Sequence, residues 1–192
     1  MAAVEDAVIV AGGIGSRMLP ASAAIAKELL PLVDIPAMTH LAREAINAGA
    51  KRLHIITSPT KDFSSILSDN SWAAQKRSDI DEELISPFND VEIKVHVQEV
   101  PKGFGDALNC ALHSIQGPFL ILLGDNILLD TYSGVSGYKA SNASKLLVEE
   151  FSKTSLPCVG LAAVEDPENY GVVSMNGNLV KDIIEKPSRS TA

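Results

Sequence analysis

The stretch that decides the fold is AVIVAGGIGSR, residues 7–17, in which an apolar run leads into a glycine-rich turn. The run 7–11 is short and wholly apolar, which is typical of a β-strand buried inside a sheet. Glycines without a Cβ let backbone amides approach a polyanion closely. The sequence therefore predicts a phosphate-binding turn at the carboxyl end of this strand, built on Gly12, Gly13 and Gly15.

Two cations accompany this turn, Arg17 within it and Lys27 ten residues later. Their fixed positive charge suits a triphosphate, and the alternative is that both are solvated surface cations. The dinucleotide fingerprint G-x-G-x-x-G does not fit, because Met18 stands where its third glycine belongs. A P-loop fails as well, because Arg17 is the residue five positions after Gly12. A tight turn without a ligand is the remaining alternative for the glycines alone.

The longer segment 12–34 resembles the signature of the sugar-1-phosphate nucleotidyltransferases. It reads GGIGSRMLPAS at 12–22 and AKELLPLVD at 26–34, against the family patterns G-G-x-G-[ST]-R-x-x-P and P-K-E-x-L-P-L-V-D. The resemblance implies an enzyme of the uridylyl-transferring branch, which uses Mg²⁺ and forms UDP-glucose and pyrophosphate from UTP and glucose 1-phosphate. The expected reaction is an in-line attack on the α-phosphate.

The composition limits the classes of protein to which this chain can belong. The chain has 192 residues and 46% hydrophobic content, so we expect one globular domain over residues 1–192. Its net charge of −8 argues against a nucleic-acid partner. The N-terminal region shows neither an export signal nor a membrane span. Cys110 and Cys158 are too few for a disulfide scaffold, and we expect buried thiols in a cytoplasmic protein.

Strand and helix patterns alternate along the chain. Strands are predicted at 7–11, 52–57, 93–98, 119–123 and 158–164, helices at 36–48, 105–115 and 143–153, short helices within 61–85, and a hairpin of 172–174 with 179–185. The wholly apolar strand 119–123 is expected to be covered on both faces. This order predicts a three-layer α/β/α sandwich with a mixed, mainly parallel central sheet, of the nucleotidyltransferase-like, Rossmann-related class.

Polar residues follow three of these strands, and ligands of such sheets bind at the carboxyl ends of the strands. Besides the glycine turn, these residues are Gln98 with the Gly103 loop, and Asp125 after strand 119–123. One carboxylate together with substrate phosphates suffices for Mg²⁺, so Asp125 is the predicted metal ligand. The alternative role for Asp125 is to cap the following turn.

The resemblance implies further roles for the same edge of the sheet. Arg17 would bind the β- and γ-phosphates, and Lys27 would neutralise the α-phosphate during attack. The family's base-contacting glutamine corresponds to Gln98, and its K-G-x-G loop to 102–105, which includes Gly103. Backbone groups of Ala11 and Gly12 would complete base and ribose binding.

Two motifs near the end of the chain also resemble the family, YGVV at 170–173 and EKP at 185–187. The resemblance implies that Gly171 and Glu185 bind sugar hydroxyls and that Lys186 binds the sugar phosphate. Without the family, these residues would be read as a turn and as surface charge.

The chain departs from the family pattern in four respects. Ala26 replaces a proline, while Ala23 and Ile35 stand where lysines are common. Family members also continue past E-K-P, so we expect the chain to lack the family's C-terminal portion, including a second metal-binding aspartate. Asp130 and Asp166 are candidate substitutes, and neither is favoured by its spacing.

Two alternatives stay open at this point, and a third lacks its usual motif. The chain could be a non-catalytic relative that binds nucleotide sugars, or a thymidylyltransferase that acts on glucose 1-phosphate, because the two branches share the glycine turn and the glutamine. A glycosyltransferase commonly carries D-x-D at the metal strand, and this chain has Gly124-Asp125-Asn126 there instead. The sequence leaves a homo-oligomer open.

Overall fold

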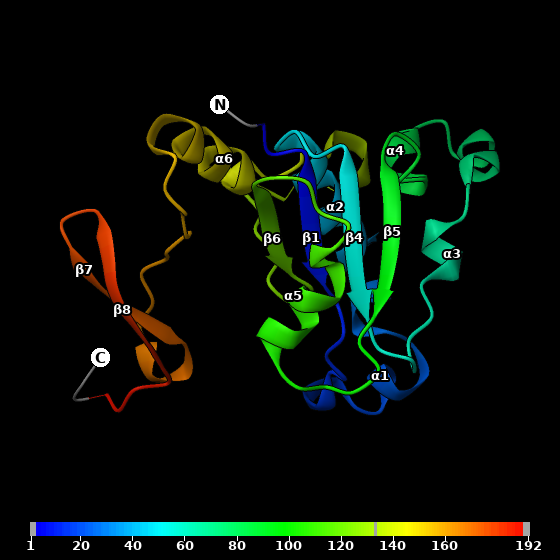
Figure 1. The fold of residues 1–192 in the computed structure, drawn as a ribbon. Coiled ribbons are helices and arrows are strands. Elements are labelled where there is room, and N and C mark those ends of the chain that lie inside the picture. Colours follow the sequence, from blue (N-terminus) through cyan, green and yellow to red (C-terminus); the bar gives the residue numbers. More distant parts are fainter. Residues whose placement is uncertain (1–2, 133, 190–192) are drawn as a thin grey trace. The chain divides into compact units, whose positions relative to one another are not determined.

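The computed structural model describes residues 3–132 and 134–189, which divide into two compact units (Figure 1). The first unit extends to Cys158 and contains a four-stranded sheet with its covering helices. The second unit begins at Val159 and contains a β-hairpin.

The sheet of the first unit has the strand order β5-β4-β1-β6, and its three pairings are all parallel. Its strands are β1 (Asp6–Val10), β4 (Arg52–Thr57), β5 (Glu92–Val97) and β6 (Phe119–Leu123). Because the strands share one direction, their carboxyl ends meet at a single edge, which lies at the bottom of the sheet in Figure 1. The predicted positions of all four strands are confirmed to within one residue.

Helices cover both faces of this sheet, as the alternation of side chains along β1 requires. Ala7 and Ile9 share a buried cluster with helix α2 (Ala37–Asn47). Val8 points the other way and packs with Ala107 and Ala111 of helix α5 (Phe104–Leu112). Figure 1 shows α5 in front of the sheet and α2 behind it. The predicted three-layer α/β/α architecture is therefore confirmed.

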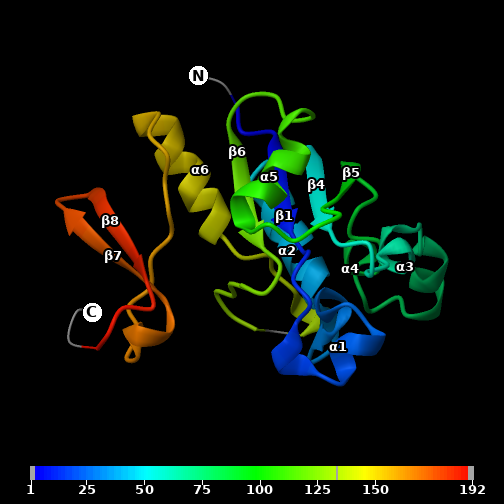
Figure 2. The same cartoon turned by 60° about the horizontal axis from the view of Figure 1, so that its bottom comes forward.

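Shorter elements surround these layers. Figure 2 brings forward the carboxyl edge of the sheet, where α1 and the segment after β1 lie. The remaining elements of the first unit are η1 (Ser16–Met18), α1 (Ala21–Ala24), η2 (Lys27–Leu29), β2 (Pro31–Leu32), β3 (Ile35–Pro36), α3 (Ser64–Leu67), η3 (Ser71–Lys76), α4 (Glu82–Ile85), η4 (Val135–Gly137) and α6 (Ala143–Thr154). The second unit contains η5 (Pro167–Asn169), β7 (Gly171–Asn176) and β8 (Leu179–Glu185), and the paired β7 and β8 confirm the predicted hairpin.

The predicted strand at 158–164 is wrong, because this segment has no regular structure. Its apolar side chains Val159, Leu161 and Val164 are 51%, 54% and 43% exposed. A strand exists only where its backbone groups pair with a neighbouring strand, and no window of local sequence specifies that neighbour.

Two burial predictions are also wrong. Strand β6 is not covered along the whole of both faces: on the α5 side Phe119 is partly buried, whereas Ile121 and Leu123 are about two-fifths exposed. The thiols are free but not buried: Cys110 is half-buried at the margin of the apolar face of α5, and Cys158 is exposed. Among the described residues, no helix combines the length and the apolar content needed to cross a membrane.

Candidate functional site

The glycine turn leaves β1 at the carboxyl edge of the sheet and folds against Lys27. Gly15 has φ +72°, a left-handed conformation that favours glycine. A Cβ on Gly15 would also lie 3.1 Å from Cδ of Lys27. The hydroxyl of Ser22 donates a hydrogen bond of 2.8 Å to the carbonyl of Gly15 and closes the turn. Both the backbone and the packing of the turn therefore depend on a glycine at this position.

An ion pair joins a predicted catalytic residue, Lys27, to the predicted metal ligand, Asp125. Nζ of Lys27 lies 2.7 Å from Oδ2 of Asp125, although 98 residues separate the two in sequence. The pairing with Lys27 lowers the pKa of Asp125, and the nearby charge of Arg17 acts in the same direction. The Lys27 side chain is 12% exposed, that of Asp125 is 60% exposed, and Arg17 is exposed. Arg17 is therefore accessible to an anionic ligand, and Lys27 is held in place beside it by Asp125.

Asp125 reaches this position because β6 is the parallel neighbour of β1. The backbone continues the ladder past the last strand residue, and the amide of Gly124 donates a 2.9 Å hydrogen bond to the carbonyl of Val10. A Cβ on Gly124 would lie 2.8 Å from that oxygen and 3.2 Å from Cα of Ala11. The glycine before Asp125 is thus required by the close approach of two backbones.

Gln98 follows β5 and is held by two acceptors. Its Nε2 donates to Oδ2 of Asp106 at 2.7 Å and to the carbonyl of Gly103 at 3.2 Å. Its Oε1 lies 3.9 Å from where a Cβ on Gly12 would stand. The side-chain amide therefore presents its oxygen toward the glycine turn. We did not predict Asp106 as a partner of Gln98, although it stands in the first turn of the helix that follows Gly103.

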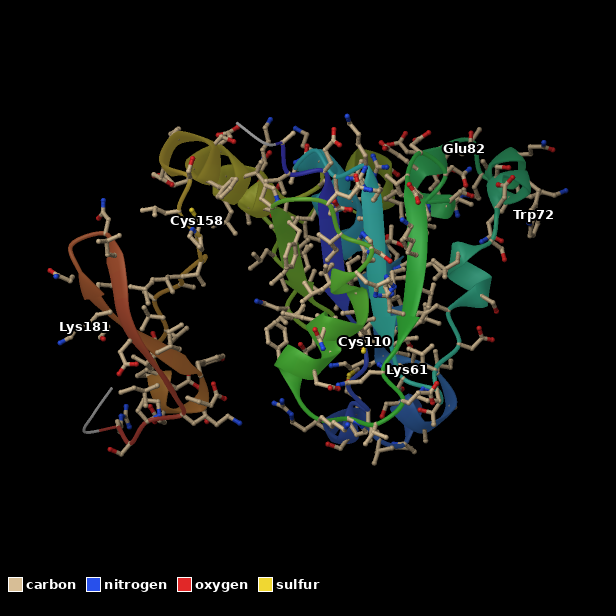
Figure 3. The ribbon with its side chains drawn as sticks, viewed as in Figure 1. Lys61, Trp72, Glu82, Cys110, Cys158 and Lys181 are labelled. Atoms are coloured by element: carbon tan, nitrogen blue, oxygen red, sulfur yellow. The ribbon has the colours of Figure 1, made fainter. Side chains whose placement is uncertain are left out.

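A second ion pair, between Glu28 and Lys61, was missed by the sequence analysis. Glu28 is fully buried, and its two oxygens lie 2.8 and 2.7 Å from Nζ of Lys61. In Figure 3, Lys61 is labelled at the carboxyl edge of the sheet. The only sequence signal for Lys61 was its position just after a predicted strand. Glu28 follows Lys27 in the segment 12–34 that resembles the family signature.

The three residues predicted to bind the sugar phosphate lie in the second unit. Gly171 is paired with Glu185 in the hairpin register, and a Cβ on Gly171 would lie 3.2 Å from Oε2 of Glu185. Lys186 follows with φ +46°, and its amide donates to the carbonyl of Tyr170. The hairpin thus brings these three residues together at one end.

Asp125, the predicted metal ligand, has a carboxylate that is 60% exposed beside Lys27. The candidate substitutes for the family's second metal-binding aspartate are both hydrogen-bonded to asparagines: Asp130 accepts from Asn142, and Asp166 of the second unit accepts from Asn169. Within residues 3–132 and 134–189, no three histidine, cysteine or acidic side chains gather as a metal site. A metal at Asp125 would therefore take most of its ligands from phosphate and water, as Mg²⁺ commonly does.

The departure from the family pattern at Ala26 leaves the backbone in a proline-compatible conformation. Ala26 has φ −53°, close to the value that a proline ring imposes. Ile25 before it is extended, as a residue that precedes a proline should be. The loop that carries Lys27 thus keeps its path without the proline.

Comparison with known proteins shows the family of the chain. Residues 6–192 match the family model described as "Nucleotidyl transferase". A UTP–glucose-1-phosphate uridylyltransferase of Bacillus subtilis is 32% identical over 207 residues, which cover 100% of this chain and 68% of that protein. The chain spans about two thirds of the length of the curated relatives it matches.

Solved structures share the fold. A structure described as UTP-bound UGPase from Acinetobacter baumannii superposes with a TM-score of 0.75 at 24% identity, covering 98% of this chain and 70% of that one. A structure described as a putative glucose-1-phosphate thymidylyltransferase from Bacillus anthracis gives a TM-score of 0.70 at 26% identity, covering 96% and 65%.

Proposed function

The chain belongs to the nucleotidyl transferase family, and from this premise we propose that it transfers a uridylyl group from UTP to glucose 1-phosphate, forming UDP-glucose and pyrophosphate. The observation that carries the proposal is the meeting of the glycine turn, Lys27 and Asp125 at one edge of the sheet. Backbone amides, a fixed cation and a hard-metal ligand are the groups that a nucleoside triphosphate needs.

The nucleotide would bind along the carboxyl edge of the sheet. The amides of Gly12, Gly13 and Gly15 would receive the phosphates, and the backbone of Ala11 would contact the nucleoside. At the base, Gln98 and the loop at Gly103 would make the contacts. The support for this orientation is that Oε1 of Gln98 faces Gly12.

The transfer would be an in-line displacement at the α-phosphorus. A phosphate oxygen of glucose 1-phosphate forms a new bond to that phosphorus as the bond to the bridging oxygen of the β-phosphate breaks, and pyrophosphate leaves. No covalent intermediate on the protein is needed, because such transfers depend on alignment and charge stabilisation. Lys27 would stabilise charge at the α-phosphate, and exposed Arg17 would bind the departing β- and γ-phosphates.

Asp125 would hold the Mg²⁺ that accompanies UTP. Its exposed carboxylate matches the oxygen ligands that this cation prefers. Bound there, Mg²⁺ would neutralise part of the phosphate charge. In the ligand-free protein Lys27 balances the charge of Asp125. With a cation held by Asp125, Lys27 would be available to the α-phosphate.

For the sugar phosphate we propose Gly171, Glu185 and Lys186. Their adjacency at the end of the hairpin supports a shared role. A carboxylate can accept hydrogen bonds from sugar hydroxyls, and an ammonium can pair with phosphate. We also propose a cytoplasmic location, which the free thiols of Cys110 and Cys158 support.

A pyrophosphate-release assay with glucose 1-phosphate and each of the four ribonucleoside triphosphates tests the proposal. We expect release with UTP and Mg²⁺, and loss of release when the metal is chelated. Calorimetry with UTP and UDP-glucose runs beside it. Binding without release would indicate a non-catalytic nucleotide-sugar-binding protein, and no binding would refute the site.

The second candidate activity is thymidylyl transfer, which the likeness to the Bacillus anthracis structure favours. Adding dTTP to the same assay separates the two activities. A higher kcat/KM with dTTP than with UTP would replace the uridylyl assignment and keep the mechanism.

A further inference from the structure

Beneath the candidate site, a buried ion pair involves two residues to which the proposed reaction gives no role. The carboxylate of Glu28 is fully buried, and Lys61 is 7% exposed. Nζ of Lys61 donates to both oxygens of Glu28, and it donates a third hydrogen bond, of 2.5 Å, to the carbonyl of Ala11. All three hydrogens of the ammonium therefore have a protein acceptor, and none is left for a substrate.

These hydrogen bonds connect three separate segments of the carboxyl edge. Ala11 is the residue from which the glycine turn starts, and Glu28 lies in η2 directly after Lys27. Lys61 belongs to the loop after β4, at the edge of the sheet where Figure 3 labels it. Oε1 of Glu28 also lies 3.1 Å from where a Cβ on Gly124 would stand, so the β6 turn packs on the same carboxylate.

The burial of Glu28 and Lys61 and the charges around them argue that the main role of this ion pair is not to stabilise the fold. Burial lowers the pKa of Lys61, and the bonds to Glu28 oppose that effect. Of the nearby charges, Lys27 lowers the pKa further and Asp125 raises it. Because removing two charges from water offsets most of their attraction, a buried ion pair is weak evidence of stability. Its fixed geometry is the more informative property.

We propose that Lys61 is a positioning residue for nucleotidyl transfer. By holding Glu28 and the Ala11 carbonyl on one ammonium, it sets the position of Lys27 relative to the glycine turn. This inference rests on the proposed function, in which Lys27 must meet the α-phosphate while the turn holds the nucleotide. A displacement of about 1 Å between such groups is enough to lower a rate strongly.

The main test uses the double variant Lys61→Met with Glu28→Gln, which removes both charges and keeps the approximate side-chain volumes. The matched control is Lys51→Met, because Lys51 also pairs with a glutamate, Glu5, but does so next to the amino end of the sheet. Initial rates with Mg-UTP and glucose 1-phosphate give kcat and both KM values. Circular dichroism at the assay temperature gives the folded fraction.

We expect kcat per folded molecule of the double variant to fall tenfold or more, while KM for glucose 1-phosphate stays within twofold. Lys51→Met should keep all three parameters within twofold of the parent. A kcat of the double variant that equals the parent's after correction for the folded fraction would show a purely structural role, and that result would overturn the proposal.

If the double variant does not fold, the single variant Lys61→Arg is tested in its place. A guanidinium keeps the charge and can pair with Glu28, but its planar fork cannot reproduce the three directions of an ammonium. We expect a folded protein whose kcat is at least threefold lower at unchanged KM, and a parental kcat would overturn the proposal.

The parent chain is assayed first. Absence of turnover in the parent refutes the proposed function and the positioning role with it. Parental turnover that all Lys61 variants retain refutes the positioning role alone.

Discussion

At the scale of single residues, the candidate site depends on two charged side chains and on glycines whose missing Cβ atoms let backbones approach. Asp125 lies just beyond β6, the parallel neighbour of β1, and Lys27 reaches it from η2, which follows the glycine turn and α1. Gly124 lets the end of β6 lie against Val10. Substitutions of Lys27 and Asp125 test the chemistry of the site, and substitutions of glycines test its packing.

Removal of either charge should lower turnover without unfolding the protein. We expect Lys27→Ala and Asp125→Ala to lower kcat by about a hundredfold, the scale of losing one preorganised charge-stabilising group. Pyrophosphate release at saturating substrate measures the effect. The control is Lys94→Ala, because Lys94 forms a surface pair with Glu92 on β5. Parental turnover in both Lys27 and Asp125 variants would exclude this site.

Two glycine substitutions should change stability in opposite directions. Gly124→Ala places a Cβ 2.8 Å from the carbonyl oxygen of Val10, and we expect a loss of about 1–3 kcal/mol in the free energy of unfolding. In contrast, Gly105 lies in α5, and a Cβ there meets nothing within 4 Å. Gly105→Ala should therefore stabilise the protein by about 0.5–1 kcal/mol. Urea denaturation without ligand measures both, and equal effects would contradict the packing argument.

At the scale of elements, the loop that carries Lys27 and the packing of α5 on the sheet lend themselves to direct tests. The loop follows a proline-compatible path through Ala26. On the α5 face of the sheet, three histidines meet: the rings of His54 and His96 stack at 5.3 Å, and His113 contacts His96 edge-on at 5.7 Å.

Restoring the family proline should stabilise the loop. Ala26→Pro fits the observed φ, and we expect the free energy of unfolding to rise by about 0.4–1 kcal/mol because the unfolded chain loses freedom. Ala23→Pro is the matched control, because the amide of Ala23 donates to the carbonyl of Pro20 inside α1. This control should destabilise the protein. Thermal unfolding measures both, and a destabilising Ala26→Pro would show that the backbone path differs.

The histidine cluster should make stability depend on pH. Burial is the main cause that lowers the pKa of His96, the charges of His54, His113 and Lys94 act in the same direction, and a backbone hydrogen bond with Cys110 opposes them. The folded protein therefore resists protonation that the unfolded chain accepts near pH 6.5. Stability should fall as the pH drops below about 6.5 and level off below the pKa of the folded state.

The variant His96→Gln isolates this effect, because it removes the titrating ring from the α5 face. Urea denaturation at pH 7.5 and pH 5.5 should show a smaller loss of stability for the variant than for the parent. An identical loss in the two proteins would mean that other groups cause the pH dependence.

At the scale of the whole molecule, the two units differ in how they bury their residues. Strand β1 lies between two parallel neighbours and is buried along most of its length. The hairpin of β7 and β8 has two strands, and every residue of β8 is exposed. Two-stranded hairpins are only marginally stable in water.

Hydrogen exchange should therefore separate the units. We expect the amides of β7 and β8 to exchange at least a hundredfold faster than those of β1 and β4, because opening the hairpin exposes little apolar surface. Mass spectrometry of exchange on the full chain measures the difference. Equal protection in the hairpin and the sheet would show that the hairpin opens only when the sheet does.

The sequence predicts those parts of the site that follow from strand order. The meeting of the glycine turn with the end of β6 agrees with that expectation, because carboxyl ends of parallel strands meet at one edge, whereas the contact of Lys27 with Asp125 also depends on how η2 folds back. The links of Gln98 to Asp106 and of Glu28 to Lys61 were not predictable, because they depend on how loops fold against one another. For the same reason the segment 158–164 was assigned as a strand in error, since pairing is a property of two segments and not of one.

The way Gln98 is held has a consequence for which nucleobase the protein would accept. With its amide nitrogen committed to Asp106 and Gly103, Gln98 offers a base only an oxygen. Uracil and thymine carry a hydrogen on N3 that can meet this oxygen, whereas cytosine has a lone pair there, and two acceptors repel each other. A fixed acceptor of this kind would disfavour cytidine nucleotides bound through N3 and remain indifferent to the methyl group by which thymine differs from uracil.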